Sequence, residues 1–232
     1  MLRLQTLVVA ATLALSAPAV AQTRPAVAAA PIIDGAALSG PAPAADSAQA
    51  AADRLSMHPT VSAERLAQAR ADIPWSPWVA MNPVFGDTFV ETRLPRTARV
   101  FADVTNGLSP PIGAAKDAYS RRRPFLDNPS VIQCDAPDDR LAASGSYPSG
   151  HSAGGWAWAL VMAELVPSRA DAILQRGRDY GDSRVICGYH FPSDIEAGRV
   201  LAAGIIARMH ADPAFRRDLD AARRELARAY PN

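Results

Sequence analysis

The sequence is nearly devoid of lysine: a single one, Lys116, stands among 24 basic residues. In a chain that otherwise uses arginine, this lysine is either chance or the sign of a site that needs a compact ammonium group. Basic and acidic residues balance to a formal net charge of +1. The composition therefore gives no general attraction to nucleic acid or to an anionic membrane surface, and we expect neither as a partner.

Cysteine is also scarce, because Cys134 and Cys187 are the two in the chain and they form no CxxC pair. A thiolate metal site is therefore not expected. In an oxidising compartment an even count favours a disulfide, and two buried reduced thiols are the alternative.

Long apolar runs are missing after the N-terminus, where one covers residues 7–15. That run is about half of the ~20 residues that a membrane-spanning helix needs. Arg3 precedes it and the small residues Ala19-Val20-Ala21 follow it, an order typical of a secretory signal peptide. We predict a cleaved signal peptide over 1–21 and export, with a retained anchor as the alternative.

Strand signals are absent as well, since no hairpin turn, alternating strand or internal repeat is found. Residues 22–52 are rich in Ala and Pro and predict a flexible arm. Residues 53–232 are long enough for one domain with a substantial core, and their pattern predicts an all-α, single helical bundle. Helices are expected over 62–72, 96–106, 112–121, 150–166 and 168–185 and from Pro192 and Pro213, with an irregular connection over 74–95.

Two basic residues bracket one predicted helix end. Lys116 lies on the helix, and Arg123 follows its end, where Pro124 prevents the helix from continuing. Two cations at this separation can converge on one anion. A solvated basic helix end is the alternative, because Arg121 and Arg122 adjoin.

A second cluster is the sequence GSYPSGH, residues 145–151, which leads directly into a strongly apolar helix. Free N–H groups and the helix dipole make such a helix start a ready anion site. Ser149 and Gly150 allow the backbone to approach a ligand closely, and His151 lies at the edge. An ordinary capped helix with a histidine in its first turn is the alternative.

A third cluster contains Arg184, His190 and Asp194. Arg184 offers a planar fork suited to phosphate oxygens. The Asp194 carboxylate, in the first turn of a helix, is placed to accept a hydrogen bond from one ring nitrogen of His190 and leave the other as a nucleophile. A metal half-site or a structural contact is the alternative, but no third ligand has metal-like spacing. We expect no metal and no cofactor.

Taken together, the clusters combine three cations, a helix N-terminus and two histidines in different segments. This combination predicts phosphoryl transfer, in which one histidine attacks phosphorus and the other protonates the leaving oxygen.

In order along the chain, the clusters resemble the three-part signature of the type 2 phosphatidic acid phosphatase (PAP2) superfamily, which includes the vanadium haloperoxidases. The motifs are Lys116-x6-Arg123-Pro124, Pro148-Ser149-Gly150-His151 and Ser183-Arg184-x5-His190-x3-Asp194. The stretches GSYPSGHS and SRVICGYH are similar to the bacterial class A non-specific acid phosphatases, with one departure at Ser152, where that class usually has Thr. The resemblance extends from about Arg96 to Tyr230.

The resemblance implies an exported, periplasmic, metal-independent acid phosphatase with an all-α fold that hydrolyses many small phosphate monoesters. It implies that His190 is the nucleophile, that Asp194 orients it, and that His151 is the general acid and then the base. The implied phosphate-binding residues are Lys116, Arg123, Ser149, Gly150 and Arg184. Transfer of phosphate to other alcohols and assembly into a homo-oligomer are left open.

Three other functions compete with this interpretation. A lipid phosphate phosphatase of this superfamily usually has several membrane spans, which the sequence lacks. A vanadate-dependent haloperoxidase-like oxidoreductase uses the same anion pocket, but the short chain and the GSYPSGHS form argue against it. Simple anion binding without turnover does not need an oriented imidazole.

Overall fold

The structure is a computed structural model that describes residues 33–57, 60–128, 130–136 and 139–231. These residues form α-helices and two short 3-10 helices, and none of them forms a strand. The expected all-α fold is therefore confirmed. The predicted signal peptide, residues 1–21, lies outside the described residues.

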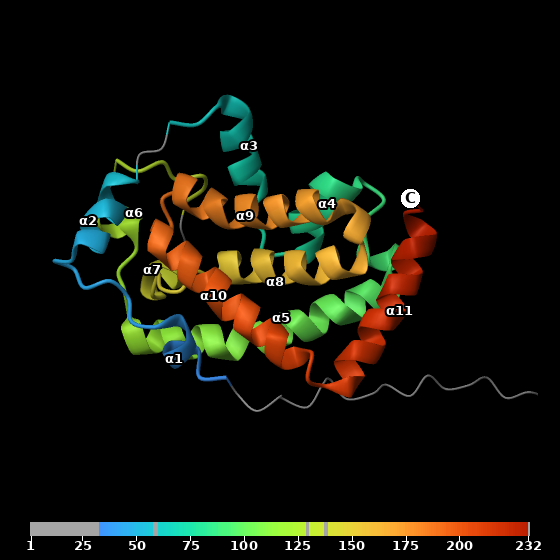
Figure 1. Ribbon diagram of the computed structural model, residues 1–232. Helices are drawn as coiled ribbons and strands as arrows, with labels where there is room; N and C mark the ends of the chain where they lie inside the picture. The colour runs from blue at the N-terminus through green and yellow to red at the C-terminus, as the bar shows by residue number, and fades with distance from the viewer. Residues whose placement is uncertain (1–32, 58–59, 129, 137–138, 232) are drawn as a thin grey trace, which may run out of the picture.

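The helices follow one another along the chain with short connections (Figure 1). The first half contains α1 (Gly35–Ser39), α2 (Ala48–Leu55), α3 (Ala63–Ala71), α4 (Pro77–Phe85), η1 (Glu91–Arg93), α5 (Pro95–Tyr119) and α6 (Pro124–Asp127). The second half contains α7 (Asp139–Ala143), α8 (Gly150–Leu165), η2 (Pro167–Arg169), α9 (Ala170–Ile186), α10 (Pro192–Met209) and α11 (Pro213–Ala229). No described helix is both long enough and apolar enough to cross a membrane.

Helix α8 forms the centre of the bundle. Figure 1 shows α9 and α5 on opposite sides of it, with α10 crossing obliquely, and α8 contacts all three. Its sequence is apolar around most of its circumference, which is the pattern of a fully buried helix. The buried positions include Ala153, Ala157, Trp158, Val161, Met162 and Leu165.

Two glycines let α9 and α10 approach α8 closely. A Cβ on Gly177 of α9 would lie 2.4 Å from the Ala159 Cβ, and one on Gly198 of α10 would lie 2.6 Å from the Ser149 carbonyl oxygen. Neither position has room for a larger residue unless the helices separate. These contacts matter for function because they bring together the ends of α8, α9 and α10.

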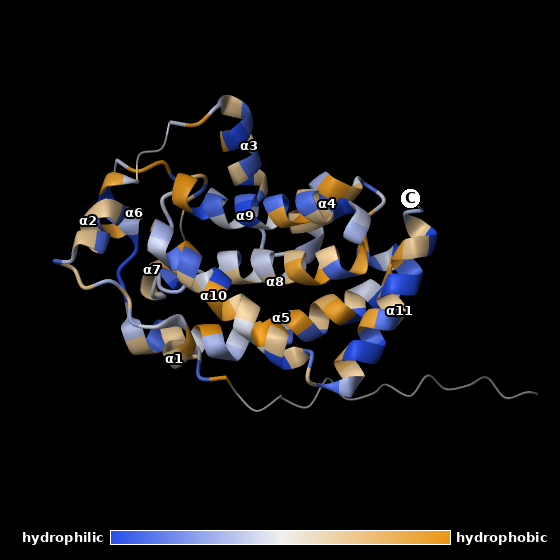
Figure 2. Ribbon diagram, in the orientation of Figure 1, coloured by the Kyte–Doolittle hydropathy of each residue, from blue (hydrophilic) through white to orange (hydrophobic). Residues whose placement is uncertain are grey.

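The outer helices follow the predicted apolar stripes. On α11 the residues Phe215, Leu219, Ala222 and Leu226 are buried, and Tyr230 packs against the same core. Figure 2 shows the remaining surface of α11 as strongly hydrophilic. On α10 the expected face from Ile195 to Met209 is buried in the same way.

Two parts of the fold differ from the sequence-based expectation. The helices predicted over 96–106 and 112–121 are one continuous helix, α5, although Pro110 and Pro111 each remove a backbone donor. Burial of Leu108, Pro111 and Ile112 favours continuity and offsets that loss. The connection over 74–95 contains α4 and η1, because Pro77 is at the first helical position, where proline is tolerated.

The expected flexible arm is also more ordered than its composition suggested. Within residues 22–52, those from 33 onward include α1 and most of α2. Tyr119 and Tyr147 donate hydrogen bonds of 2.7 and 2.8 Å to the Ala36 and Ser39 carbonyls, which hold α1 against the bundle. The proposed start of the domain at residue 53 falls inside α2, so this part of the arm belongs to the packed structure.

A disulfide joins Cys134 to Cys187, as the even cysteine count favoured. Cys187 ends α9 and is fully buried, and it lies three residues before His190. The bridge therefore links the segment before α7 to the segment that carries Arg184 and His190.

We expect the disulfide to stabilise the fold, because it closes a loop with a sequence separation of 53 residues. In the chain-entropy description a loop of that length contributes about 4 kcal/mol to the free energy of unfolding. Urea unfolding of a Cys134→Ala/Cys187→Ala variant should show a loss approaching this value. Reductant should destabilise the wild type and leave the variant unchanged. A variant as stable as the oxidised wild type would contradict the expectation.

Candidate active site

Three chain segments carry the candidate residues, and all end in the same region. Lys116 lies in the last turn of α5, and Arg123 is the N-cap of α6. Ser149 caps α8, with Gly150 and His151 in its first turn. Arg184 is in the last turn of α9, His190 follows that helix, and Asp194 is in the first turn of α10. The structure thus brings together every residue that the sequence motifs singled out.

His190 is held between a carboxylate and a guanidinium. Its Nδ1 lies 3.4 Å from the Asp194 Oδ2, and its Nε2 lies 3.2 Å from the Arg123 Nη1. Because a guanidinium only donates hydrogen bonds, Nε2 must accept, so the ring proton of the neutral imidazole is on Nδ1. The lone pair of Nε2 therefore points into the cationic cluster, as a nucleophile requires.

Burial and positive charge together keep the His190 imidazole neutral. Its pKa is lowered well below the usual value by burial, and further by Arg123, Lys116 and Arg184. Burial raises the pKa of the Asp194 carboxyl, and the Arg121 guanidinium opposes that rise.

Arg123 is fixed by backbone carbonyls rather than by carboxylates. Its Nε donates to the Leu141 and Ser144 carbonyls at 2.8 and 3.0 Å, and its Nη1 donates to the Tyr189 carbonyl at 3.1 Å. Carbonyls orient the guanidinium without neutralising it. Burial, aided by Arg184, lowers its pKa to about 10.

Lys116 is the second cation of the cluster and is partly buried. Its Nζ donates a 2.5 Å hydrogen bond to the Gly145 carbonyl, at the start of the loop that leads into α8. Burial and, to a smaller extent, the Arg123 charge lower its pKa to about 7, and Asp194 acts in the opposite direction. The ammonium group therefore titrates close to neutral pH.

Arg184 has unused hydrogen-bond donors. Its side chain is buried, and its guanidinium lies 4.3 Å above the Tyr189 ring. Its Nε and Nη1 are buried and have no hydrogen-bond partner among the described residues. Buried donors without partners are costly, and donors fixed in the plane of a guanidinium suit the oxygens of a phosphate group.

The N-terminus of α8 lies against the start of α10. The Ser149 N–H donates to the Asp194 carbonyl at 2.9 Å, and the Ser149 Oγ accepts from the Ser152 N–H at 3.3 Å. The N–H groups of Gly150 and His151 have no partner inside the helix, as at every helix start. They and the helix dipole add donors suited to an anion.

His151 is positioned by a segment that the motifs do not include. Its Nε2 donates to the Ile73 carbonyl at 2.9 Å, and its ring stacks on Tyr180 with centroids 5.5 Å apart. Burial and the Arg184 charge lower its pKa well below the usual value, while the Ile73 carbonyl raises it. Since Nε2 is engaged, Nδ1 is the ring nitrogen that remains for a reacting group.

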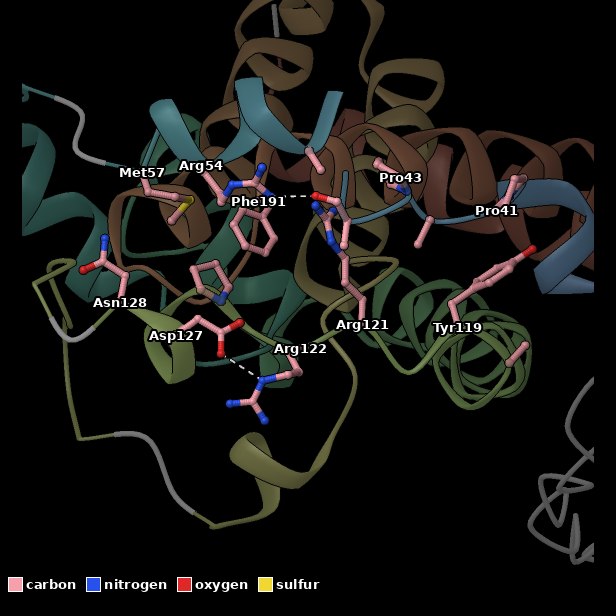
Figure 3. Close-up of a pocket in the computed structure, with 15 residues that line it drawn as sticks. Pro41, Pro43, Arg54, Met57, Tyr119, Arg121, Arg122, Asp127, Asn128 and Phe191 are labelled. Atoms are coloured by element: carbon pink, nitrogen blue, oxygen red, sulfur yellow. Dashed lines mark hydrogen bonds and ion pairs between the residues drawn. The ribbon is translucent and has the colours of Figure 1, made fainter. Parts of the chain in front are cut away.

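Sequence reasoning missed Arg121 as a site residue. It was considered only as part of a solvated basic helix end, and that interpretation fits Arg122, whose side chain is 66% exposed, but not Arg121, at 12%. The Arg121 Nη1 donates to the Asp194 Oδ1 at 2.7 Å. In Figure 3, Arg122 pairs with Asp127, whereas Arg121 extends past Phe191 toward α2.

The part of the chain that the structure describes offers no group of three His, Cys, Asp or Glu side chains suited to a metal ion. The charged groups around His190 are instead mainly cationic. Their chemistry fits an anion.

Comparison with known proteins places this site in a family. The family model described as PAP2 superfamily matches residues 100–218, about half of the chain and every candidate residue from Lys116 to Asp194. The chain therefore belongs to the PAP2 superfamily, as its three motifs predicted.

Curated relatives that the chain resembles are named acid phosphatase or non-specific acid phosphatase. It is 48% identical to an acid phosphatase of Zymomonas mobilis over 118 residues, 51% of this chain and 45% of that protein. It is 48% identical to a non-specific acid phosphatase of Providencia stuartii over 116 residues, 50% and 46% of the two chains. A non-specific acid phosphatase of Salmonella typhimurium is 41% identical over 149 residues, 62% and 58%. The matched part spans about half the length of these relatives.

The lowered pKa of Lys116 predicts how anion binding depends on pH. Below a pKa of about 7 the group is an ammonium, and above it the pocket loses one positive charge. Sulfate stays a dianion between pH 5.5 and 8.5, so its affinity should fall by about tenfold per pH unit above neutrality. Calorimetric titration with sulfate measures this fall.

A Lys116→Arg variant is the matched control, because its guanidinium stays charged over the same range. Its sulfate affinity should be nearly independent of pH. Equal pH dependence in the two proteins would show that Lys116 is not the titrating group.

Proposed function

We propose that this chain is an exported acid phosphatase that hydrolyses small phosphate monoesters through a phosphohistidine on His190. The observation that carries the proposal is the position of the His190 imidazole, whose Nδ1 faces Asp194 and whose Nε2 faces Arg123 in a cluster of three cations. Such a cluster favours binding of a phosphate group. An oriented imidazole beside it is needed for nucleophilic attack and is not needed for binding alone. The names of the relatives agree with this activity, and the sequence-based signal peptide agrees with export.

In the first step the His190 Nε2 forms a bond to phosphorus as the bond from phosphorus to the ester oxygen breaks. Lys116, Arg123 and Arg184 hold the three equatorial oxygens, where negative charge is concentrated in the transition state. The Nδ1–H of His190 stays directed at Asp194, which stabilises the positive charge that the ring acquires. Protonated His151 gives the proton on its Nδ1 to the leaving oxygen.

In the second step the neutral His151 takes a proton from water, and the water oxygen forms a bond to phosphorus as the bond to Nε2 breaks. Phosphate leaves, and both histidines return to their starting states. Because the pKa of His151 is lowered well below its usual value, the protonated form that starts the cycle is favoured by acid. The bound phosphate dianion shifts that equilibrium toward protonation, because it offsets the cations around His151.

Assays of a phosphomonoester panel with and without a chelator test the reaction class. Hydrolysis should survive exhaustive chelation, and vanadate should inhibit it by adopting the five-coordinate geometry of the transferring group. Activity that is lost in chelator and restored by a divalent ion would refute the metal-free mechanism. Halide oxidation with added vanadate, in place of hydrolysis, would indicate an oxidoreductase.

The phosphoenzyme itself provides a direct prediction. A phosphoramidate is labile in acid and stable in base, so acid-sensitive label from a radioactive phosphate ester should survive an alkaline quench. The label should be absent from a His190→Ala variant, whose turnover should fall by on the order of 10³-fold or more. An Asp127→Asn variant, changed at an exposed carboxylate that pairs with Arg122, should label normally. Label that persists in His190→Ala would refute the assignment.

A second prediction separates the two histidines. A His151→Asn variant should still phosphorylate His190 from p-nitrophenyl phosphate, because nitrophenolate leaves without a proton. It should release phosphate slowly, since no base activates water. Rapid mixing should therefore show a burst of nitrophenol near one equivalent and then a slow steady rate.

The same variant should form almost no phosphoenzyme from an alkyl phosphate such as glycerol phosphate, whose alkoxide needs the proton. A His151→Asn/His190→Ala variant should show no burst with either substrate. Loss of the burst in His151→Asn, with phosphate binding intact, would show that the roles given to the two histidines are wrong.

A further inference from the structure

The Asp194 carboxylate uses its two oxygens for different partners. Its Oδ2 faces the His190 Nδ1 and accepts from the Phe191 N–H at 2.8 Å. Its Oδ1 accepts from the Arg121 Nη1 at 2.7 Å. The carboxylate is fully buried, so Arg121 is its charged support on the side away from the imidazole.

Arg121 is held on its other side by a second buried carboxylate. Its Nη2 donates to the Asp53 Oδ2 at 2.7 Å, and its guanidinium lies 4.2 Å above the Phe191 ring. The Ser193 Oγ accepts from Nη1 at 2.7 Å. The Arg121 guanidinium therefore hydrogen-bonds to both Asp194 and Asp53, and the Phe191 ring packs against its face and fixes the plane of the guanidinium.

Asp53 comes from a part of the chain outside the family match. It lies on α2, whereas the match begins at residue 100. Its carboxylate is buried and also accepts from Ser193, through the N–H at 3.1 Å and the Oγ at 2.5 Å. Ser193 precedes Asp194, so Asp53 holds both the guanidinium and the backbone that presents the Asp194 carboxylate.

We propose that Arg121 and Asp53 are positioning residues that fix the Asp194 carboxylate, charged and oriented, against His190. Neither residue touches a phosphate in this proposal, and both act through Asp194. The inference rests on the proposed function, because it assigns them a part in preparing the nucleophile.

The arrangement alternates in sign from Asp53 through Arg121 to Asp194. Arg121 favours the ionised form of a carboxyl whose burial favours the neutral form. The negative charge of Asp53 acts against the positive charge of Arg121, so it limits how far Arg121 lowers the pKa of Asp194. The other titratable groups that act on Asp194 or respond to it are His190, Lys116, Arg123 and Tyr147.

Removal of the Arg121 charge is the main test, and Arg122→Gln is the matched control at the adjacent exposed arginine. In an Arg121→Gln variant the pKa of Asp194 rises, so the acid limb of the kcat profile should move to higher pH by at least about one unit. Near pH 5, kcat should fall at least about tenfold while KM changes little, because the three phosphate-binding cations remain. The Arg122→Gln profile should coincide with that of the wild type.

The second variant, Asp53→Asn, changes charge and keeps the shape of the side chain. With Asp53 neutral, Arg121 acts on Asp194 alone, so kcat should fall while the acid limb moves to lower pH. Opposite shifts in the two variants are a result that general loosening of the structure does not produce. This variant also tests the proposal if Arg121→Gln does not fold, which thermal unfolding establishes first.

Chemical rescue adds a further readout. Arg121 lines a cavity of about 580 Å³ between α2 and the segments around Phe191 (Figure 3), which opens to solvent. Guanidinium at millimolar concentration should therefore restore part of the kcat of an Arg121→Ala variant and return its acid limb toward the wild-type position. It should have no such effect on Arg122→Ala.

Nitrogen-15 spectra of the histidine rings separate this proposal from the proposed function, because they need no turnover. In the wild type and in Arg121→Gln alike, Nδ1 of His190 should carry the proton, because Arg123 still donates to Nε2. In Arg121→Gln the Nδ1–H signal should shift, because its hydrogen bond to Asp194 weakens. A wild type that shows this pattern but hydrolyses no phosphate ester would overturn the proposed function and leave the positioning role standing. An active enzyme in which the acid limb and the Nδ1–H signal of Arg121→Gln match those of Arg122→Gln would overturn the positioning role.

Discussion

The gathering of three cations around one imidazole is the constraint on which the rest of the site depends, with Arg123 and Arg184 buried and Lys116 partly buried. Lys116, Arg123 and Arg184 would repel one another and be poorly solvated in a protein interior. Backbone carbonyls orient two of them without cancelling their charge, and the Tyr189 ring supports the third. The positive potential is thus preserved for an anion, and burial together with the same potential lowers the pKa of His190.

The helical bundle makes this concentration of charge possible by bringing helix ends together. Close packing at Gly177 and Gly198 brings the termini of α9 and α10 against the start of α8. The candidate groups lie at these termini and in the loops beside them, whereas the body of α8 is largely apolar. The Cys134–Cys187 bridge adds a covalent link at the end of α9. Stability of the fold and geometry of the site therefore rest on the same few contacts.

Features that depend on neighbouring residues could be predicted from the sequence, whereas contacts between distant segments could not. The largely apolar helix α8 and the single apolar face of α11 were predicted from the periodicity of apolar residues. The motifs identified residues that lie close together in space. The sequence did not predict that α5 continues through Pro110 and Pro111, because the packing that offsets their missing hydrogen bonds is long-range. The hydrogen bond from His151 to the Ile73 carbonyl uses a backbone atom, which leaves no side-chain signal in a sequence.

Asp53 shows why the boundary of a functional site differs from the boundary of its motifs. It directly follows the alanine-rich stretch over 22–52 that was predicted to be flexible, and nothing local distinguishes it from a solvated acid. Its significance arises only when Arg121 bridges it to Asp194, across 68 and 73 residues of sequence. A buried carboxylate next to a guanidinium is stable only while both are present, so α2 and the nucleophile are energetically coupled. In our proposal, an N-terminal segment outside the family match is therefore part of what keeps the Asp194 carboxylate charged.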